Sequence, residues 1–418
     1  MILNNIKSTY LFLFIWMNFQ LVSCAQQAKS TTKPVEKTQT ALKTGADRTN
    51  VYLPKLKGKN VAIVANQTSI LQVLQRAEVS LNVMGSKLVT HHLVDYLHNY
   101  RGINVQKVFA PEHGFRGKAD AGETIKDGVD TKTGLPIVSL YGKNKKPSQE
   151  QLKGIDVVVF DIQDVGARFY TYISTLHYVM EACAEAGIPL IIFDRPNPNG
   201  HYVDGPLLEP EHKSFVGMHP IPIVYGMTIG EYGQMINGEK WLNNGIQCDL
   251  TVIPLEGYTH DYQYSLPVKP SPNLPNDKAI NLYPSLCFFE GTNVSAGRGT
   301  DTQFQIYGSP FLQKSAFSFT PQPNEGAKYP KHENKLCYGE DLTDAEHLNS
   351  LNLSWLLKAY QQTENKKEFF NSFFTKLAGT TKLQQQIEQG LTEEQIKASW
   401  KDDLEAFNTI RKKYLIYE

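Results

Sequence analysis

The sequence has no excess of either charge and few charged residues for its length. Over 418 residues, 42 Lys and Arg balance 42 Asp and Glu, so the formal net charge is zero. Nucleic-acid-binding proteins carry a basic excess, and the balance therefore argues against nucleic acid as a partner. Charged residues make up only 20% and aromatic residues 11%, which is a globular composition and excludes an acidic disordered chain.

Several catalytic motifs are absent as well. The sequence has no G-x-x-x-x-G-K-[ST] loop for nucleotide phosphates, and no G-x-G-x-x-G follows its first predicted strand. It also lacks the G-x-S-x-G elbow of the α/β-hydrolases and the H-E-x-x-H zinc motif. Apart from Cys24, four scattered cysteines form no C-x-x-C pair. We therefore expect no cofactor and no metal site.

The first 24 residues, 1–24, read as an export signal. Lys7 precedes an apolar run from Leu11 to Met17, which is shorter than the roughly 20 residues of a membrane-spanning helix. The segment ends in Leu-Val-Ser followed by Cys24, which resembles a lipobox. That resemblance implies an exported lipoprotein of the periplasm, attached to a membrane only through acylated Cys24. An ordinary signal peptide or a buried apolar N-terminus stays open.

Residues 25–50 are polar, rich in Thr and Lys, and almost without large apolar side chains. Such a segment cannot bury enough surface to offset the entropy lost on ordering. We expect a disordered tether.

From residue 58 onward, short apolar segments alternate with amphipathic ones. Strands are predicted at 60–65, 105–110, 136–140, 156–160, 188–193 and 250–253, and helices at 86–99, 171–186 and 228–237. This rhythm predicts an α/β fold, with a Rossmann-like parallel-sheet domain at 51–260 that carries helices on both faces. The continuous β-branched run at 156–160 is typical of a strand buried on both sides.

The pattern changes after Pro254. Residues 255–335 are rich in Pro, Gly, Asn and Tyr and show little periodicity, and helical patterns return at 350–363, 366–378, 382–389 and 392–411. We expect a C-terminal α+β auxiliary domain at 261–418.

Polar side chains follow almost every predicted strand, at the edge where open α/β sheets bind ligands. The candidate binding residues in these loops and in the auxiliary domain are Asn66, His113, Arg116, Asp161, Asp164, Arg168, Tyr170, Arg195, Asn197, Glu290, Asn293 and Arg298. The four arginines are able to offer paired donors to a substrate carboxylate, with the two aspartates orienting them. Solvated arginines in weak surface pairs are the alternative.

Glu112 and Glu123 are separated by a glycine-rich loop that can fold back on itself. Two carboxyl groups facing one bond, one protonated and one ionised, are the usual requirement for glycoside hydrolysis. Either residue could instead cap a helix or pair with an arginine, as Glu112 with Arg116.

The loop sequences PEHGFRG, AGE, DGVDTKTGLPIVSLYG, FDIQDVGARFYTYISTL, FDRPNPNG, VDGPLL and FEGTNVSAGRGTDTQFQIYGSP resemble those of the exo-β-N-acetylmuramidases of the NamZ type. The resemblance runs from about Lys55 to the C-terminus. It implies an active cleft at the interface of the two domains and release of N-acetylmuramic acid (MurNAc) from the non-reducing ends of peptidoglycan fragments, such as MurNAc-GlcNAc and muropeptides. One departure is His201 after FDRPNPNG, where the family often has a second glycine.

The resemblance also implies residue roles. Glu112, in PEHGFRG, is the expected general acid, and Glu123, in AGE, the expected second carboxylate. We expect Arg116, Arg168 and Arg298 to recognise the lactyl carboxylate that distinguishes muramic acid from glucosamine. A lipoprotein that binds muropeptides without cleaving them stays open as the alternative, and an esterase or amidase would lack a recognisable nucleophile. The sequence leaves the oligomeric state and the choice between retention and inversion open.

Overall fold

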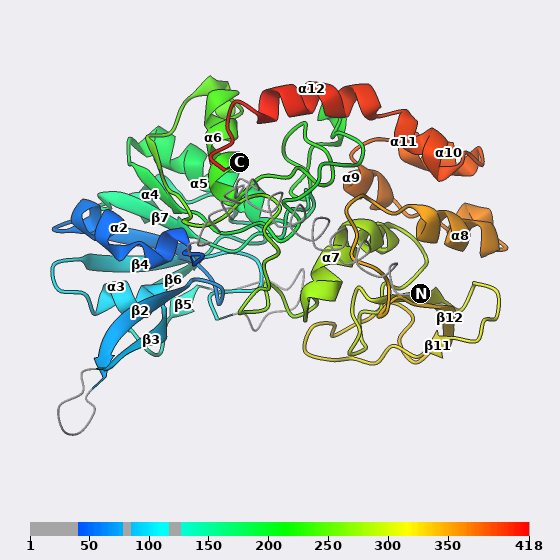
Figure 1. Ribbon diagram of the computed structural model, residues 1–418, viewed down its shortest axis with the longest axis horizontal. Helices are drawn as coiled ribbons and strands as arrows, with labels where there is room; N and C mark the ends of the chain where they lie inside the picture. The colour runs from blue at the N-terminus through cyan, green and yellow to red at the C-terminus, as the bar shows by residue number, and fades with distance from the viewer. Residues whose placement is uncertain (1–40, 78–84, 117–126, 418) are drawn as a thin grey trace, which may run out of the picture. The chain divides into compact units, whose positions relative to one another are not determined.

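A computed structural model of the chain describes residues 41–77, 85–116 and 127–417 (Figure 1). Cys24 and Glu123 lie outside the described residues. Within those ranges no helix has the length and apolar character needed to cross a membrane.

A seven-stranded sheet organises the N-terminal half of the fold, in the order β5-β6-β4-β1-β7-β8-β9. Its strands are β1 (Asn60–Ala65), β4 (Asn104–Ala110), β5 (Gly128–Val129), β6 (Pro136–Ser139), β7 (Val157–Asp161), β8 (Leu190–Phe193) and β9 (Leu250–Ile253). All pairings in this sheet are parallel except that of β5 with β6. The interior strand β7, between β1 and β8, is buried along its whole length. The predicted α/β fold with a parallel sheet is confirmed.

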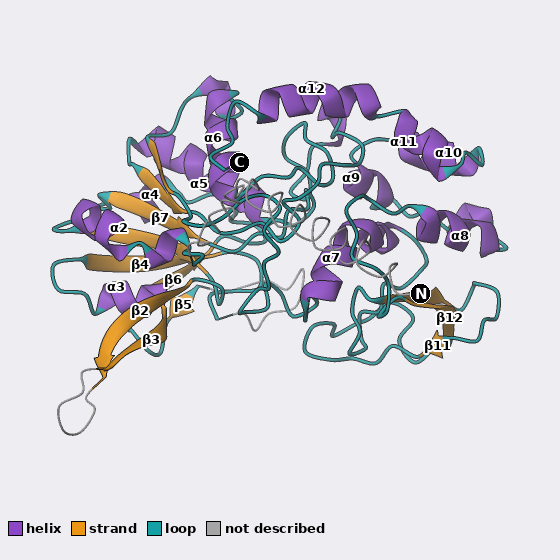
Figure 2. Ribbon diagram, viewed as in Figure 1, coloured by secondary structure: helices purple, strands orange, loops and turns teal. Residues whose placement is uncertain are grey.

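Alternate residues of the strands pack into two apolar layers, one on each face of the sheet. On one face Ala62 and Val64 of β1 join a core with α5 (Tyr172–Ala186) and α6 (Ile229–Gly238), near the short α4 (Gln149–Leu152). On the other face Val61 and Ile63 join a core with α2 (Thr49–Leu56) and α3 (Leu93–His98). Figure 2 shows these helices on either side of the orange strands.

The helix predicted at 86–99 is wrong over its first half. Residues 85–92 form β3 (Gly85–His92), which pairs antiparallel with β2 (Ile70–Ala77) in a hairpin that extends away from the main sheet (Figure 2). The segment Leu88-Val89-Thr90 combines β-branched residues with exposure of alternate side chains, and cross-strand pairing decides its structure. The helix begins only at Leu93, where the His92 ring accepts a hydrogen bond from the Val94 amide (3.3 Å).

The tether predicted at 25–50 is wrong over residues 41–50, which are part of the fold, and its residues 25–40 lie outside the described residues. The turn η1 (Gly45–Asp47) packs on the ends of β8 and β9, and the Gly45 amide donates to the Asp194 carbonyl (2.8 Å). A Cβ atom at residue 45 would lie 2.5 Å from the backbone of Asp194 and Ile253, so only glycine allows this approach. The contact is made by backbone and small residues, which a hydrophobicity pattern does not reveal.

The C-terminal half combines a small antiparallel sheet with helices. The sheet has the order β10-β12-β11, with β10 (Ile306–Ser309), β11 (Ser318–Phe319) and β12 (Cys337–Asp341). The helices are α7 (Asp277–Leu286), α8 (Ser354–Gln362), α9 (Phe374–Ala378), α10 (Lys382–Glu388), α11 (Glu393–Ala398) and α12 (Lys401–Arg411). Short 3-10 turns are η2 (Pro210–His212), η3 (Asn243–Gly245), η4 (Cys287–Gly291) and η5 (Lys366–Glu368). The α+β character expected for this half is confirmed.

The helix predicted at 392–411 is divided in two. Between α11 and α12 the Trp400 side chain is buried, and its Nε1 donates to Asp204 Oδ1 (3.2 Å). Trp400 belongs to the same apolar core as Ala62 of the main sheet and Phe288 of the C-terminal half. One continuous core therefore joins the two halves, and from Ala41 onward the chain forms a single compact unit.

The four cysteines after residue 40 are all buried and unbonded: Cys183, Cys248, Cys287 and Cys337. The expectation that Cys183 acts as a small apolar core residue is confirmed, since it packs in the core beside α6.

Candidate active site

A cavity of about 480 Å³ lies beyond the carboxyl ends of β4, β6 and β7. Its lining comes from both halves of the chain, including the loop residues 112–113, 141–145 and 169–171 of the sheet and residues 271–304 of the C-terminal half. Five residues that the sequence pointed to meet here: Glu112, His113, Tyr170, Glu290 and Arg298. The placement matches the cleft expected between the two domains.

Glu112 lies two residues after the end of β4, in a tight turn. The Gly114 amide donates to the Pro111 carbonyl (3.0 Å), and both His113 and Gly114 have left-handed backbone angles, with φ of 69° and 77°. Left-handed angles are unfavourable for a residue with a Cβ atom, so the backbone of the turn is strained at His113. The turn places Glu112 and His113 together on the cavity wall.

The Glu112 carboxylate is held by a hydroxyl from the start of a helix. Thr171 Oγ1 donates to Glu112 Oε2 at 2.6 Å. Thr171 is the residue that precedes α5, yet its side chain makes no capping bond to that helix. The Tyr141 hydroxyl also contacts Glu112, and burial together with this carboxylate raises the pKa of Tyr141. Glu112 is thus a buried carboxylate oriented by hydroxyl groups.

Glu290 and Arg298 supply charged side chains to the cavity wall from the C-terminal half of the chain. Arg298 Nη1 lies 3.5 Å from Glu290 Oε2, and Nη2 donates to the Gly326 carbonyl (3.3 Å). Nearby, the buried Lys331 ammonium donates to the carbonyls of Phe289, Thr292 and Val294. Burial lowers the pKa of Lys331. This part of the cavity wall therefore presents one carboxylate, Glu290, and one cation, Arg298, with the Lys331 ammonium buried behind them.

Lys145 adds a positive charge that the sequence analysis did not select. It lines the cavity after β6, and its Nζ lies 4.6 Å from the centre of the Phe215 ring. The lysine-rich segment Lys143 to Lys146 was the available signal, but such a run usually marks a solvated surface. At the cavity, Phe215 packs on Tyr141 with ring centres 6.1 Å apart, and Lys146 pairs with Glu181 and Glu185 of α5, so contacts distant in sequence hold this segment.

Much of the remaining lining is aromatic or aliphatic. The side chains are Tyr141, Phe169, Tyr170, Phe215, Val216, Leu274, Tyr283, Phe304, Phe373 and Leu377. The Tyr170 hydroxyl donates to the Pro270 carbonyl (2.8 Å), and its ring packs edge-on against Tyr172 and Tyr283. An apolar lining with a few fixed polar groups is typical of small-molecule sites, and aromatic rings suit the apolar faces of a sugar.

Arg168 does not line the cavity. Its guanidinium is fully buried and donates to four backbone carbonyls, those of Pro206, Ile221, Leu377 and Ala378, at 2.6–3.0 Å. Burial lowers its pKa to about 9. Its hydrogen bonds go to the backbone, so Arg168 joins segments of the chain instead of presenting donors to a substrate.

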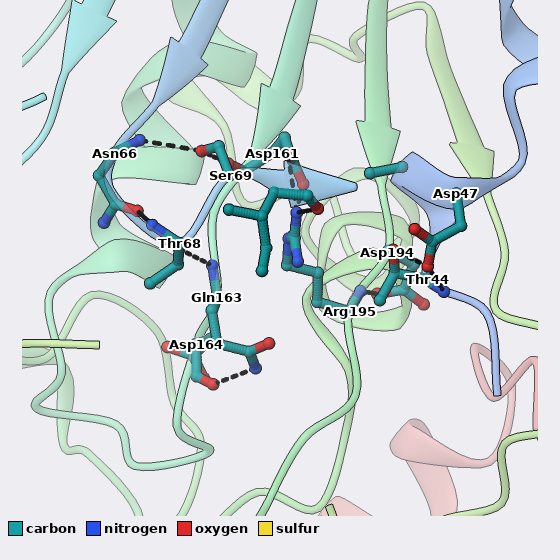
Figure 3. Close-up of polar contacts among 12 residues, drawn as sticks. Thr44, Asp47, Asn66, Thr68, Ser69, Asp161, Gln163, Asp164, Asp194 and Arg195 are labelled. Atoms are coloured by element: carbon teal, nitrogen blue, oxygen red, sulfur yellow. Dashed lines mark hydrogen bonds and ion pairs between the residues drawn. The ribbon is translucent and has the colours of Figure 1, made fainter. Parts of the chain in front are cut away.

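Arg195 and Arg116 also have internal partners. Arg195 forms a buried two-point pair with Asp161, at 2.6 and 2.9 Å (Figure 3). This confirms the expectation that Asp161 orients an arginine. Arg116 lies over the Phe115 ring and pairs with Asp130 (2.8 Å) and Asp95 (3.2 Å). Neither arginine is among the cavity-lining residues.

The remaining candidates serve the loops around the strand ends. Asn66 Oδ1 accepts from the amide and hydroxyl of Thr68, as Figure 3 shows in part. Asp164 accepts from the Tyr225 hydroxyl and the Gly166 amide, and burial raises its pKa to about 6. Asn197 donates to the Met227 carbonyl (2.8 Å). Asp164 therefore orients no arginine, and these side chains shape the loops.

One candidate binding residue of the sequence analysis remains to be placed. Asn293 lines a separate cavity of about 220 Å³ near Phe311. The sequence analysis expected no metal site. Among the described residues, one group has the ligand types and spacing to hold a metal ion: Glu209, Glu211 and His212 at η2, whose potential ligand atoms lie within 4.8 Å of one another. Glu209 already pairs with Lys382 (2.8 Å), and the group lies outside the active-site cavity.

Comparisons with known proteins agree on one family. The family model described as "Exo-beta-N-acetylmuramidase NamZ, N-terminal" matches residues 61–278, and the corresponding C-terminal model matches residues 281–417. The peptidoglycan beta-N-acetylmuramidase NamZ of Bacillus subtilis (strain 168) is 38% identical over 443 residues, which cover 98% of this chain and 100% of that protein.

Two crystal structures of DUF1343 family proteins from Bacteroides fragilis NCTC 9343 are similar over 90% of this chain and 99% of their own. They share 46% and 26% sequence identity with it, at TM-scores of 0.79 and 0.73.

Proposed function

The chain belongs to the exo-beta-N-acetylmuramidase NamZ family, and from that premise we infer that it is a glycoside hydrolase that releases N-acetylmuramic acid from the non-reducing ends of peptidoglycan fragments. The observation that carries this conclusion is the full-length similarity to a peptidoglycan beta-N-acetylmuramidase. The cavity suits the task, because it places a buried carboxylate, Glu112, among aromatic side chains. A non-catalytic muropeptide-binding protein is not favoured, since the similar protein is an enzyme.

We propose that Glu112 is the general acid that protonates the glycosidic oxygen. Our proposed second carboxylate is Glu123 of the AGE motif, which lies outside the residues that the structure describes. Among the described residues that line the cavity, Glu290 is the carboxylate that accompanies Glu112. Because it contacts Arg298, which we propose binds the substrate carboxylate, we assign Glu290 a role in binding.

We propose that Arg298, assisted by Lys145, recognises the lactyl carboxylate of muramic acid. Both cationic side chains line the cavity. The sequence analysis grouped Arg116 and Arg168 with Arg298. The Arg116 guanidinium pairs with Asp130, however, and that of Arg168 donates to buried backbone carbonyls. A charge-assisted hydrogen bond to a carboxylate contributes roughly 1.5–3 kcal/mol, which is enough to separate muramic acid from glucosamine by a factor of about 10 to 100.

A glycoside assay tests these roles in a soluble form that begins at Gln26. A chromogenic β-MurNAc glycoside should be hydrolysed by this form, and Glu112→Gln should lower kcat by a factor of about 10² to 10⁴, the usual contribution of general acid catalysis. Arg298→Gln should lower the preference for MurNAc over GlcNAc glycosides. No release by the unmodified form, or full release by Glu112→Gln, would contradict the assignment.

We further propose that the protein is a periplasmic lipoprotein anchored through Cys24, with residues 25–40 as its tether. The support is the lipobox-like Leu-Val-Ser-Cys at 21–24 and the polar composition that follows it. In cells, the full chain should fractionate with membranes, and Cys24→Ser should move it to the soluble exported fraction. An unchanged distribution for Cys24→Ser would refute the anchor and leave the hydrolase activity untouched.

A further inference from the structure

We propose that a second, polar cavity beside the active-site cavity binds the leaving group of the substrate, the N-acetylglucosamine residue on the far side of the scissile bond. The proposal rests on the function proposed above. An exo-acting hydrolase encloses the terminal sugar, so the remainder of the glycan must contact a surface that adjoins the enclosed site.

The second cavity shares a wall with the first. It has a volume of about 430 Å³ and is lined by Gln67, Val268, Lys269, Ser271, Pro272, Asp301, Gln303, Asn324, Glu325 and Gly326. Ser271 lines both cavities, and Gly326 accepts hydrogen bonds from two residues of the first, Asn273 (2.6 Å) and Arg298 (3.3 Å). Two other cavities, near His347 and near Phe311, share no lining residue with the first.

The wall between the two cavities is the backbone segment 269–271. On the catalytic side, the Tyr172 hydroxyl lies 3.2 Å from the Pro270 carbonyl and 3.5 Å from the Glu112 carbonyl. On the other side, Gln67 Nε2 donates to the carbonyls of Lys269 and Pro270, both at 3.1 Å. The segment 269–271 therefore lies between the main chain at Glu112 and the second cavity. A sugar joined to the bond that Glu112 protonates would pass over Ser271 into it.

Three side-chain amides give this region an excess of hydrogen-bond acceptors. Gln67, Asn273 and Asn324 each use their NH₂ group on backbone carbonyls: those of Lys269 and Pro270, of Gly326, and of Thr300. These bonds fix which amide atom is the oxygen, because a carbonyl accepts only from nitrogen. Each of the three oxygens is buried and accepts no hydrogen bond from the described residues. Buried acceptors without donors are unfavourable, so a ligand whose donors reach these oxygens would stabilise the wall.

The chemistry of the wall selects a neutral, donor-rich sugar. N-acetylglucosamine offers several hydroxyl groups and an acetamido N–H, which match amide oxygens. A carboxylate would face those oxygens together with the acidic side chains of Asp301 and Glu325, whereas Lys269 is the one cation among the described residues that line this cavity. The second cavity therefore disfavours a carboxylate, whereas in the first cavity Arg298 and Lys145 are proposed to bind the muramyl carboxylate.

The experiment compares two leaving groups on the full chain. We would measure kcat/KM for the disaccharide MurNAc-β-1,4-GlcNAc and for an aryl β-MurNAc glycoside, whose leaving group has no comparable donors. Asn324→Ala and Gln67→Ala should each lower the disaccharide-to-aryl ratio about tenfold, as loss of one or two hydrogen bonds predicts. Asn349→Ala is the matched control, because its exposed side chain lines the separate cavity near His347. Its ratio should equal that of the wild type.

The outcomes separate this proposal from the proposed function. Wild-type protein that cleaves neither substrate would refute the function. Wild-type cleavage of both, with wild-type ratios in Asn324→Ala and Gln67→Ala, would refute the leaving-group site and leave the function intact. A ratio that falls only when the disaccharide carries a stem peptide would overturn the sugar assignment in favour of the peptide. Because the ratio is taken within each variant, a loss of folded protein cancels.

Discussion

At the scale of single residues, Thr171 shows how a helix start serves the catalytic group. A threonine before a helix usually accepts a hydrogen bond from the first helical turn, with a contribution of about 1 kcal/mol. Thr171 makes no such bond and donates its hydroxyl to Glu112 instead. The first turn of α5 forgoes a stabilising cap, and Glu112 gains a fixed orientation. We therefore regard Thr171 as a positioning residue.

Replacing Thr171 tests this role. Thr171→Val keeps the shape of the side chain but removes the donor to Glu112, so kcat should fall about tenfold while KM changes little. Thr171→Ser retains the hydroxyl and should recover most of the loss. The measurement is steady-state kinetics on the β-MurNAc glycoside. Equal activities for the valine and wild-type forms, or equal losses for valine and serine, would contradict the role.

Sequence reasoning found the right loops but could not decide which side chains face the cavity. Glu112, Tyr170 and Arg298 line it, whereas Arg168 and Arg195 come from the same kind of loop and face the interior. The difference depends on partners distant in sequence, such as the carbonyls of Leu377 and Ala378 for Arg168. Lys145 was missed for the complementary reason, because its contact with Phe215, 70 residues later in the chain, has no signature in the local lysine-rich sequence.

At the scale of secondary structure elements, Arg168 joins the loop after β7 to one segment of the N-terminal half and one of the C-terminal half. It serves the loop before α6 through Pro206 and Ile221, and the end of α9 through Leu377 and Ala378. Gly379 follows at a positive φ, and a Cβ atom there would lie 2.6 Å from the guanidinium. One cation thus completes the hydrogen bonding of three elements.

Arg168→Met should lower the free energy of unfolding by more than about 3 kcal/mol, because four buried carbonyls lose their donor together. Urea denaturation followed by circular dichroism measures the change. Arg101→Met is the control, since Arg101 is exposed and surface substitutions usually change stability by about 0.5 kcal/mol or less. A methionine variant as stable as the wild type would show that the carbonyls find other partners.

Elements with a strong period could be predicted from the sequence, in two cases with bounds correct to within one residue. β1 is found at Asn60–Ala65 as predicted, and α5 at Tyr172–Ala186 differs from its prediction by one residue. The failures occur where long-range contacts override local pattern. Pairing with β2 makes residues 85–92 a strand, and burial of Trp400 against Asp204 divides the last predicted helix.

At the scale of the whole molecule, Asp194 joins the first and last described segments of the fold. Its carbonyl accepts from the Gly45 amide (2.8 Å), and its carboxyl group accepts from the hydroxyls of Tyr417 (2.5 Å) and Thr228 (2.7 Å). Burial is the main cause that raises the pKa of Asp194 to about 7. Within the fold this carboxyl group is therefore protonated over a wider pH range than in the unfolded chain.

The raised pKa predicts a specific pH dependence. The folded state binds the Asp194 proton more tightly than the unfolded state, so this contribution to stability is complete below about pH 4 and is lost as the pH rises to about 7. Relative to the wild type, the destabilisation by Asp194→Asn should be larger at pH 4.5 than at pH 7.5, by on the order of 3 kcal/mol. Urea denaturation at the two pH values measures it, and a difference independent of pH would refute the assignment.

The sequence separation between Arg168 and two of its carbonyl partners also determines when, during synthesis, this arginine can be fully hydrogen-bonded. Leu377 and Ala378 follow this cation by 209 and 210 residues, so at a synthesis rate of roughly 5–20 residues per second its partners emerge on the order of 10–40 seconds later. Until then the nascent N-terminal half holds an arginine that cannot be buried without cost. That half should therefore stay loose and protease-sensitive on the ribosome, which suits a chain that we propose crosses a membrane before it folds.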